Sequence, residues 1–549
     1  MYKGVKTLRI YLSKVGDTIR TIAKKFYLPI EHLLALNKQF AHSDSPIAAD
    51  SKVVLPPPEL PVAQPALPPF SSVEGPDYLD SWIPLTPIEK MEQTDYDVLI
   101  VGSGAGGGAA LWRLCEQWGR EGKRIGVIEA GNALLPTHSG NIPTLIGEQV
   151  YKLKFGNADV VGKYVPEDRE VSNILALGGR TLFWSLESPR IHPSEFKEWP
   201  FSYKELVPYY LIAENIMNVT TSYTEDSALQ EMLLERARFG GFPDAETIPV
   251  AADLEASRYG IVHSNVFFSS IICMARALNI RPFDLAVNTR AVQVLTEKGK
   301  AAGARVMTAD KKEYTLSAKN VILSASTWET PRLLLHSGIP GESIGHYLVD
   351  HSYVRGTARA KRSDFPEVIG ASKILVPDTD ERMFQLLALG PGFYKQFEER
   401  KLSEYINFAF QSYGAVEPRY ENYVSLNPVV RDDYGVPLLD IHFSFSKKDD
   451  AVIQDMFAVT KSFISALGMS MAEPLVLHPP GIVNHEAGTC RLGSSPSNSA
   501  TNPYGQIHGI EGLYVADKSV LPLNSGSNPT LTTIALAIRT ADHIVETMK

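Results

Sequence analysis

One glycine-rich stretch has the residue types and spacing to hold a redox cofactor. It reads Gly102-Ser103-Gly104-Ala105-Gly106-Gly107, which is a G-x-G-x-x-G pattern. The first glycine permits a tight turn, the second lets the backbone approach a pyrophosphate, and the last lets a helix and a strand pack closely. The pattern predicts a dinucleotide site, and by itself it leaves the choice between NAD and FAD open.

The elements around this stretch are those that such a site requires. Residues 96–101 form a short apolar run with several β-formers, which is typical of a buried parallel strand. Residues 109–118 have a helical composition, and residues 124–128 predict a second strand that ends at Glu129. The helix N-terminus would present unpaired N–H groups to the phosphates. The Glu129 carboxylate could accept hydrogen bonds from the ribose hydroxyls of adenosine.

Further motifs follow in an order that a known family shares. They are LALGGRTLFW at 175–184, WPFSYKELVPYY at 199–210, SASTWETPRLLL at 324–335, GHYLVDH at 345–351, NHEAGTCRLG at 484–493, GLYVADKSVLP at 512–522 and GSNPTLT at 526–532. Over about residues 94–549 the chain therefore resembles the glucose–methanol–choline (GMC) flavin oxidoreductases. The segment around Gly178 is most similar to that of pyranose oxidases.

This resemblance implies a catalytic pair near the C-terminus. His485 stands at the position of the family's catalytic base, and Asn528 stands at its partner position, where the family has His or Asn. Because its pKa is ordinarily near neutral, a histidine can accept the hydroxyl proton while a hydride moves to flavin N5. An amide can hold the substrate oxygen in place. We expect His351, His508 and Cys490 to be structural.

The resemblance also implies FAD as the cofactor. In pyranose oxidases, the histidine before the motif's tryptophan is covalently attached to the flavin, whereas this chain has Phe183 there, so we predict non-covalent FAD. Ser326 replaces the family's usual glycine, and its small side chain should still admit a nearby cofactor. The residues implied in binding FAD are Gly102, Gly104, Ala105, Gly106, Gly107, Glu129, Ala130, Gly178, Gly179, Thr181, Trp184, Val292, Ser326, Asp517, Asn528, Pro529 and Thr530.

Composition and charge exclude several other classes of protein. The 549 residues predict more than one domain, and the formal net charge of −9 gives no reason to expect nucleic acid as a partner. No apolar run is long enough to predict a membrane span. The three cysteines are scattered without metal-ligand spacing, which favours a reducing compartment. Because the N-terminus shows no apolar segment of the secretory type, a cytoplasmic location is the default expectation.

The first 57 residues predict a separate small module. They contain nine Lys and Arg against four Asp and Glu, so they carry a charge of about +5 and the remainder about −14. A strand over 8–12, helices that begin near Thr18 and Pro29, and a strand over 51–56 give a βααβ order. The segment resembles a LysM module, a family that binds N-acetylglucosamine polymers, which would allow association with a cell wall. The alternative is a retained fold used for packing or protein contacts.

The expected fold class is α/β. It combines a Rossmann-like FAD-binding domain of the GMC type, an antiparallel-sheet α+β substrate domain and the βααβ LysM-like module. The predicted boundaries are 1–57 for the module, 58–93 for a Pro-rich linker, 94–185, 284–351 and 481–549 for the FAD-binding domain, and 186–283 (with a lid) and 352–480 for the substrate domain.

The leading functional hypothesis is oxidation of a secondary hydroxyl of a sugar or glycoside, at C2 or C3, to a ketone. A sterol, polyol or other alcohol oxidase or dehydrogenase of the same family is the first alternative. A glycan-binding, cell-wall-associated protein with low redox activity is the second. The electron acceptor, which could be O₂, a quinone or a protein carrier, stays open, and a homo-oligomer is compatible with the sequence.

Overall fold

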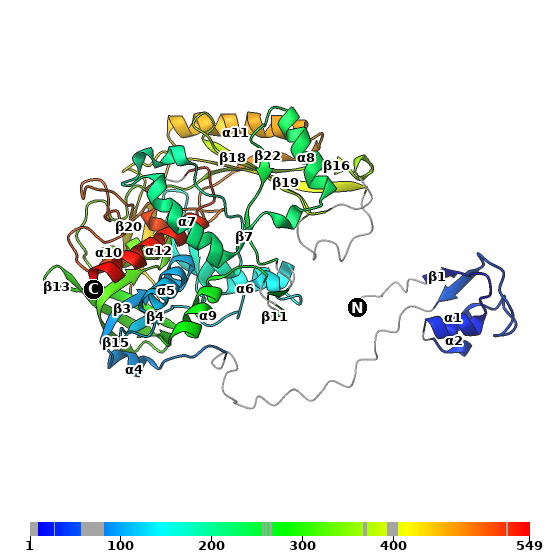
Figure 1. Cartoon of the computed structure of the whole chain (residues 1–549), viewed down its shortest axis with the longest axis horizontal. Coiled ribbons are helices and arrows are strands. Elements are labelled where there is room, and N and C mark those ends of the chain that lie inside the picture. The colour runs from blue at the N-terminus through cyan, green and yellow to red at the C-terminus, as the bar shows by residue number, and fades with distance from the viewer. Residues whose placement is uncertain are drawn as a thin grey trace. The chain divides into compact units, whose positions relative to one another are not determined.

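The computed structural model describes residues 9–26, 28–55, 82–145, 147–254, 257–258, 261–262, 266–365, 370–391, 404–522 and 525–549. The chain divides into two units, Met1–Asp77 and Tyr78–Lys549, which are taken one at a time below (Figure 1). Most of the predicted Pro-rich linker, residues 58–81, lies outside the described residues. No described helix is long and apolar enough to cross a membrane.

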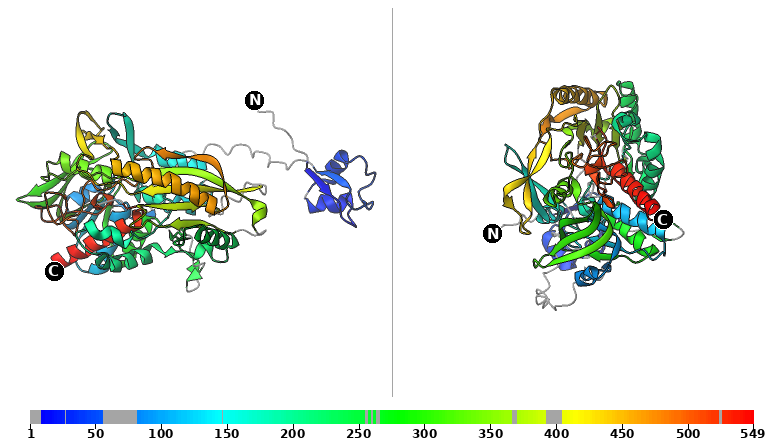
Figure 2. Two further views of the ribbon diagram at one scale, coloured as in Figure 1. Left: turned by 90° about the horizontal axis from the view of Figure 1, so that it is seen from above. Right: turned by 90° about the vertical axis from the view of Figure 1, so that its left-hand side faces the viewer.

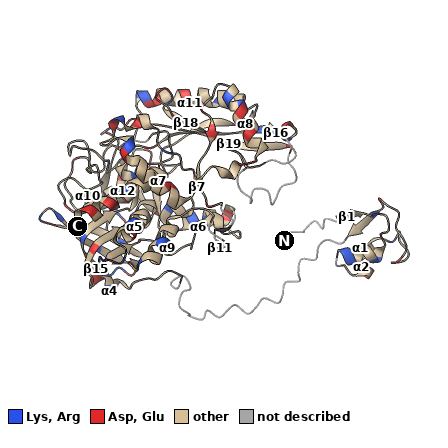
Figure 3. Ribbon diagram, in the orientation of Figure 1, with Lys and Arg blue, Asp and Glu red and all other residues tan. Residues whose placement is uncertain are grey.

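The N-terminal unit has its elements in the predicted β-α-α-β order. They are β1 (Arg9–Leu12), α1 (Ile19–Lys25), α2 (Ile30–Leu36) and β2 (Lys52–Leu55), and the two strands pair antiparallel. Thr18 caps α1 through a reciprocal pair of hydrogen bonds with Thr21, which satisfies N–H groups at the helix start. Ile22 and Leu33 are fully buried in the small core, while Lys24 and Lys25 charge the last turn of α1 (Figure 3). The kinship with LysM modules stays a prediction.

The main unit is built on a seven-stranded sheet. Its strands are β3 (Tyr96–Val101), β4 (Ile125–Ile128), β12 (Asp284–Ala286), β13 (Thr289–Glu297), β14 (Lys300–Thr308), β15 (Glu313–Leu323) and β23 (Leu513–Val515). The order is β12-β4-β3-β15-β14-β13, and β23 also pairs with β15. β12, β4, β3, β15 and β23 are parallel, and all residues of β3 are buried, which explains its continuous apolar run.

Helices cover this sheet and bury its core. α5 (Ala105–Trp118) packs against α9 (Ser270–Ile280) and α12 (Thr530–Thr547), and α12 packs against α7 (Tyr203–Met217) (Figure 1). We predicted residues 186–283 to form part of the substrate domain and a lid. The structure differs for α7 and α9, which bury apolar faces in the larger core, whereas residues 228–239 and 246–247 lie with the second sheet described below.

The end of the predicted linker also differs from expectation. Residues 82–93 contain α4 (Ile88–Glu92), and Ile83 and Met91 are buried in the core of the main unit. The Thr86 N–H donates to the Leu285 carbonyl at 2.8 Å. The apolar side chains that follow the proline-rich stretch therefore belong to the main unit, and the boundary at 93 is too late.

A second sheet has six antiparallel strands. In spatial order they are β22 (Ser470–His478), β16 (Ser352–Lys361), β19 (Tyr405–Gly414), β18 (Phe384–Leu389), β17 (Lys373–Val376) and β8 (Glu246–Thr247). α11 (Lys447–Ala466) lies along this sheet, and α8 (Ala228–Phe239) packs beside α11 (Figure 2). A capping box between Ser446 and Asp449 fixes the start of α11.

The hairpin over residues 423–442 lies outside that sheet. β20 (Tyr423–Arg431) and β21 (Pro437–His442) join β5 (Ala158–Tyr164) and β6 (Arg169–Ile174), and β21 is parallel to β5. Expecting one antiparallel sheet over 352–480 was therefore wrong for these two strands. The other α-helices and strands of the described residues are α6 (Gly147–Gly156), α10 (Ser326–His336), β7 (Val219–Thr220), β9 (Val250–Ala251), β10 (Ser257–Arg258) and β11 (Ile261–Val262), and short 3-10 turns lie between the elements.

Candidate cofactor and active site

The glycine stretch forms the turn between β3 and α5. Gly102 has φ +94°, and a Cβ atom there would lie 2.4 Å from the Ser324 carbonyl oxygen, so only glycine fits this turn. A Cβ atom on Gly104, in contrast, would meet no atom within 4 Å. That open space is where a ligand could approach the backbone, next to the N-terminus of α5.

Glu129 directly follows β4, and its side chain stabilises the glycine turn through hydrogen bonds. Its carboxylate accepts hydrogen bonds from the Ser103 N–H at 3.0 Å, the Ser103 hydroxyl at 2.6 Å and the Gly131 N–H at 2.9 Å. Burial raises the pKa of the Glu129 carboxyl, and these hydrogen bonds oppose that rise. The Ser103 hydroxyl in turn accepts from the Gly178 N–H at 2.9 Å, so the second glycine loop is fixed against the first.

A single cavity runs between these loops and the C-terminal motifs. The predicted residues that line it are Gly102, Gly104, Ala105, Gly106, Glu129, Ala130, Gly179, Thr181, Trp184, Ser326, His485, Asp517, Asn528 and Thr530. Four other predicted residues, Gly107, Gly178, Val292 and Pro529, do not line it. A Cβ on Gly107 would lie 2.0 Å from the Gly102 carbonyl oxygen, so this glycine serves helix packing. At the strand that starts with Thr289, it is Thr289, Arg290 and Ala291 that reach the cavity, whereas Val292 points into the core.

His485 and Asn528 both face this cavity, and each is held by another side chain. His485 Nδ1 lies 2.8 Å from His351 Nδ1, and Asn528 Oδ1 accepts a hydrogen bond from Gln385 Nε2 at 2.7 Å. Burial, followed by His351 and the cations Lys518 and Arg180, lowers the pKa of His485 well below its usual value. The imidazole is therefore held neutral, as a proton acceptor requires.

Four cationic residues that we had not assigned to the site also line the cavity, and two of them, Arg180 and Lys518, act on the pKa of His485. Arg180 follows the Gly-Gly pair, and Lys518 follows Asp517. The buried Glu486 carboxylate pairs with Arg180 and lies 3.7 Å from Lys518, and these charges keep the pKa of Glu486 low in spite of burial. Both residues lie within motifs quoted above, at 175–184 and 512–522, and this position was a usable signal, because a cation at a cavity wall can favour a ligand that gains negative charge.

Asp517 ties the end of β23 to the start of α10. It accepts hydrogen bonds from the Ser326 N–H at 3.0 Å, the Thr330 hydroxyl at 2.6 Å and the Ser519 N–H at 2.9 Å. Burial raises the pKa of this carboxyl against those hydrogen bonds. Ser326 has φ +101°, a backbone conformation that favours glycine.

Replacing Ser326 with glycine should therefore stabilise the main unit. A serine adopts this positive φ only at a cost in backbone strain. Its hydroxyl offsets little of that cost, because it accepts only long hydrogen bonds, at 3.4 Å, from the Trp328 and Glu329 N–H groups. Relief of this strain, less the greater entropy that glycine gives the unfolded chain, leaves a gain of about 1 kcal/mol. We expect a small rise in the melting temperature of the FAD-loaded chain. A fall in melting temperature for Ser326→Gly would show that the hydroxyl contacts outweigh the strain.

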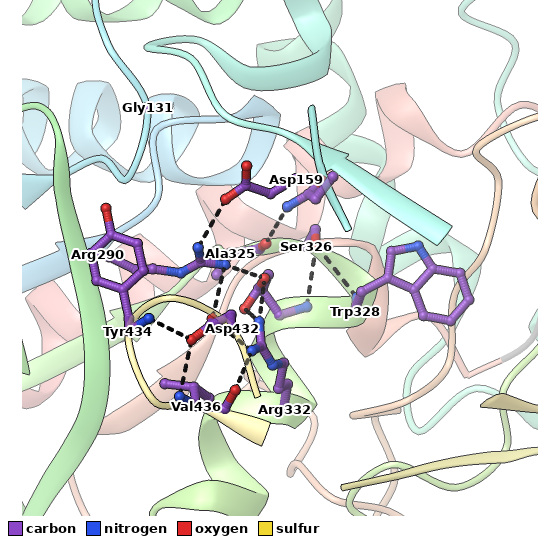
Figure 4. Close-up of polar contacts among 12 residues, drawn as sticks. Gly131, Asp159, Arg290, Ala325, Ser326, Trp328, Arg332, Asp432, Tyr434 and Val436 are labelled. Carbon is purple, nitrogen blue, oxygen red and sulfur yellow. Dashed lines mark hydrogen bonds and ion pairs between the residues drawn. The ribbon is translucent and has the colours of Figure 1, made fainter. Parts of the chain in front are cut away.

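Part of the cavity wall rests on a buried network of charges. Arg290 and Glu329 line the cavity, and Arg290 Nη2 donates to Glu329 Oε1 at 2.8 Å (Figure 4). Arg332, whose side chain is 0% exposed, donates to Glu329 at 2.9 Å and to Asp432 Oδ2 at 2.7 Å. Figure 4 shows how Asp432, from the turn between β20 and β21, lies between the two guanidinium groups.

Three free cysteines are buried, and burial raises the pKa of each thiol. Cys490 therefore lacks the thiolate character of a nucleophile.

His508 packs against Ser499, with Nε2 at 2.9 Å from the hydroxyl. Within the described part of the chain, no group of His, Cys, Asp and Glu could hold a metal ion.

Known proteins match this arrangement over most of the chain. Two family models, both described as GMC oxidoreductase, match residues 98–353 and 418–537. A C-glycoside 3-oxidase of Arthrobacter globiformis is 28% identical over 397 residues, which cover 67% of this chain and 74% of the relative. A pyranose 2-oxidase of Lyophyllum shimeji is 22% identical over 500 residues, which cover 76% and 79%.

The fold is shared with solved structures as well. The crystal structure of pyridoxine 4-oxidase from Mesorbium loti has a TM-score of 0.61 at 15% identity, and the match covers 82% of this chain and 99% of that one. This likeness concerns the fold alone. The glycine turn, the buried Glu129 and the space beside Gly104 fit the ADP half of FAD, the cofactor that the family implies. The chain belongs to the GMC oxidoreductase family, whose oxidases and dehydrogenases act on CH–OH groups.

Proposed function

We propose that the protein oxidises a secondary ring hydroxyl of a sugar or glycoside, at C2 or C3, to a ketone. The observation that carries this proposal is that one cavity is lined both by the glycine turn with Glu129 and by His485 and Asn528. The relatives named above, a C-glycoside 3-oxidase and a pyranose 2-oxidase, support a carbohydrate substrate.

The catalytic roles follow from the chemistry of the two side chains. FAD, when bound, supplies the acceptor for the hydride that leaves the carbinol carbon. His485 accepts the hydroxyl proton, a role that its neutral state allows. The Asn528 amide group, held by Gln385, donates to the substrate oxygen and fixes its position. Arg180 and Lys518 place positive charge at the cavity wall, where charge that develops on the ligand is stabilised.

The residues that would hold FAD are the cavity-lining ones among those predicted. Glu129 would bind the adenosine ribose, the N-terminus of α5 the pyrophosphate, and Asp517 the ribityl or pyrophosphate region. The N-terminal turn of α12, beginning at Thr530, would point its N–H groups at the N1–C2 carbonyl edge of the flavin. These assignments follow the family pattern, and their support is that Glu129, Asp517 and Thr530 all line the same cavity.

We predict that this FAD is bound without a covalent link. Phe183 lines the cavity where pyranose oxidases carry a flavin-linked histidine, and a phenyl ring cannot form that bond. Acid precipitation of the yellow protein should release all flavin into the supernatant. Flavin that stays with the denatured chain would contradict the prediction, and mass spectrometry of peptides would then locate the attachment.

The substrate class is tested by anaerobic bleaching of the flavin with a panel of sugars, glycosides, sterols, polyols and simple alcohols. We expect sugars or glycosides to bleach the oxidised flavin and the product to be a ketone at C2 or C3. If a sterol or a polyol reduces the flavin and no sugar does, the carbohydrate proposal fails and the alternative alcohol oxidation holds. Reoxidation with O₂, a quinone or a protein carrier then identifies the electron acceptor.

The N-terminal unit adds a separate proposal, which is binding of an N-acetylglucosamine polymer. Its support is the LysM-like sequence together with the βααβ order of its elements. Pull-down on chitin and peptidoglycan, with the whole chain and with a chain that lacks residues 1–57, tests it. Equal retention of both chains would assign the unit to packing or protein contacts instead.

A further inference from the structure

We propose that His351 is a positioning residue, which fixes the tautomer of His485 so that Nε2 of His485 is the nitrogen that takes the substrate proton. This inference rests on the proposed function, in which His485 is the base. Because the two histidines lie 134 positions apart in the chain, their contact is visible only in the folded structure.

The order of hydrogen bonds begins at a backbone carbonyl. His351 Nε2 lies 2.5 Å from the Ser525 carbonyl oxygen. A carbonyl oxygen can only accept a hydrogen bond, so His351 Nε2 must carry the hydrogen. Burial, which outweighs the effect of the Ser525 carbonyl, lowers the pKa of His351 to about 3, and the ring is therefore neutral. In a neutral imidazole the other nitrogen is the acceptor, and here that nitrogen is Nδ1.

The second hydrogen bond then has only one direction. His351 Nδ1 lies 2.8 Å from His485 Nδ1, and with His351 as the acceptor, His485 Nδ1 must donate. His485 is itself neutral, so its hydrogen is on Nδ1 and its Nε2 is the unprotonated nitrogen. A neutral base with Nε2 unprotonated is the form that can accept a hydroxyl proton.

Further contacts hold the His351 ring in place. The rings of His351 and His485 are perpendicular with centroids 4.8 Å apart, and Tyr413 packs against both, at 5.4 and 5.1 Å. The buried Asp350 carboxylate accepts from the His351 backbone N–H at 2.8 Å and from the Gly481 N–H at 2.5 Å, which anchors the segment before β16. Lys518 disfavours an imidazolium on either histidine, and Arg180 disfavours one on His485.

The test compares His351→Leu, which removes the acceptor, with His351→Asn, whose amide oxygen takes the place of Nδ1 and can accept from His485. Both are prepared as the FAD-loaded full chain. With a substrate that bleaches the flavin, His351→Leu should lower the limiting rate constant of flavin reduction on the order of 10–100-fold, as outer partners of catalytic groups do. The substrate dissociation constant should change little, and His351→Asn should recover most of the rate.

A spectroscopic readout separates positioning from a merely structural role. In ¹⁵N-histidine NMR of the resting protein, with the His485 signals assigned by difference against His485→Ala, we expect hydrogen on Nδ1 alone. In His351→Leu the two tautomers should mix, and in His351→Asn the Nδ1–H form should return. His508→Asn is the matched control, because its partner is the Ser499 hydroxyl, and it should change neither the rate nor the His485 signals.

The outcomes distinguish this inference from the proposed function. If His485→Ala loses flavin reduction while His351→Leu keeps the wild-type rate and the Nδ1–H signal, the positioning role is wrong and the base assignment stands. If His485→Ala reduces its flavin at the wild-type rate, the proposed function has lost its base. Should His351→Leu fail to fold, folded His351→Asn carries the test. If His485 has its hydrogen on Nδ1 in this variant and flavin reduction is still slow, the inference is overturned, because the tautomer of His485 would then not set the rate.

Discussion

Replacing His485 with alanine is expected to lower the rate constant of flavin reduction by substrate by about 10²–10⁴-fold, the usual contribution of a general base. The proposed acceptor of the hydroxyl proton would then be missing from the cavity, which His485 and Asn528 both line. Stopped-flow bleaching of the flavin under anaerobic conditions measures this step apart from reoxidation. His508→Ala is the control, since that histidine packs against Ser499 and does not line the cavity.

Binding of the cofactor must be unchanged for that comparison to hold. His485→Ala leaves the glycine turn and Glu129 intact, so its flavin content should match that of the wild type. A His485→Ala protein with full flavin content and the wild-type reduction rate would remove His485 from the mechanism.

The pH dependence of the wild-type protein gives an independent check on the same base. A base acts when it is deprotonated, so its activity is lost only as the pH falls through its pKa. Burial, aided by His351, Lys518 and Arg180, puts the pKa of His485 well below the ordinary value of about 6.5. The limiting rate of flavin reduction should therefore stay level from about pH 8 to about pH 6, where a histidine with the ordinary pKa would already be about three quarters protonated.

The cofactor end of the site could be predicted from sequence because its signals are local. The turn, its two flanking elements and Glu129 lie within one short stretch, and each residue type has a direct backbone reason, such as the positive φ of Gly102. Ser326 shows the limit of this reasoning. We took its replacement of glycine as a matter of size, whereas the structure shows that the backbone conformation is what favours glycine there.

The long-range contacts could not be predicted, because nothing local marks them. His351 was expected to be structural, since its own segment gives no sign that it meets His485. Residues 423–442 were expected in the antiparallel sheet of the substrate domain, but which sheet the hairpin of β20 and β21 joins depends on β5, far earlier in the chain. α9 was likewise assigned to the wrong domain, because an apolar helix face does not say which partner will cover it.

Asp432→Ala is expected to lower the free energy of unfolding of the main unit by about 3 kcal/mol, the low end of the cost of removing one partner from a buried ion pair, because Arg332 keeps its contact with Glu329. The Arg332 side chain is 0% exposed, and its Nη2 donates to Asp432 Oδ2 at 2.7 Å. Asp432 Oδ1 meanwhile accepts from the Tyr434 and Val436 N–H groups at 2.9 and 3.0 Å. The Asp432 carboxylate therefore closes the turn and, together with Glu329, neutralises the buried Arg332.

A second variant separates these two roles. Asp432→Asn keeps an oxygen for the Tyr434 and Val436 N–H groups and removes only the charge. Its free energy of unfolding should therefore fall by most of the amount expected for Asp432→Ala. Asp433→Ala is the matched control, because that neighbour in the turn is exposed, and it should stay within about 0.5 kcal/mol of the wild type. Urea unfolding of the FAD-loaded wild type and of the three FAD-loaded variants measures the differences in free energy of unfolding. Equal stability of Asp432→Asn and the wild type would show that the turn matters and the charge does not.

The direction of the pH effect follows from the same charges. Burial would raise the pKa of Asp432, but Arg332 and Arg290 outweigh it and hold the pKa below its usual value. A carboxylate with a lowered pKa stabilises the fold above its unfolded pKa of about 3.9, and that contribution is lost as the pH falls through the lower folded value. The difference in free energy of unfolding between the wild type and Asp432→Asn should therefore become smaller as the pH falls below about 4. Since Arg290 and Glu329 also line the cavity, both Asp432 variants should release FAD at a lower temperature than Asp433→Ala, and this links the stability of the network to the site it supports.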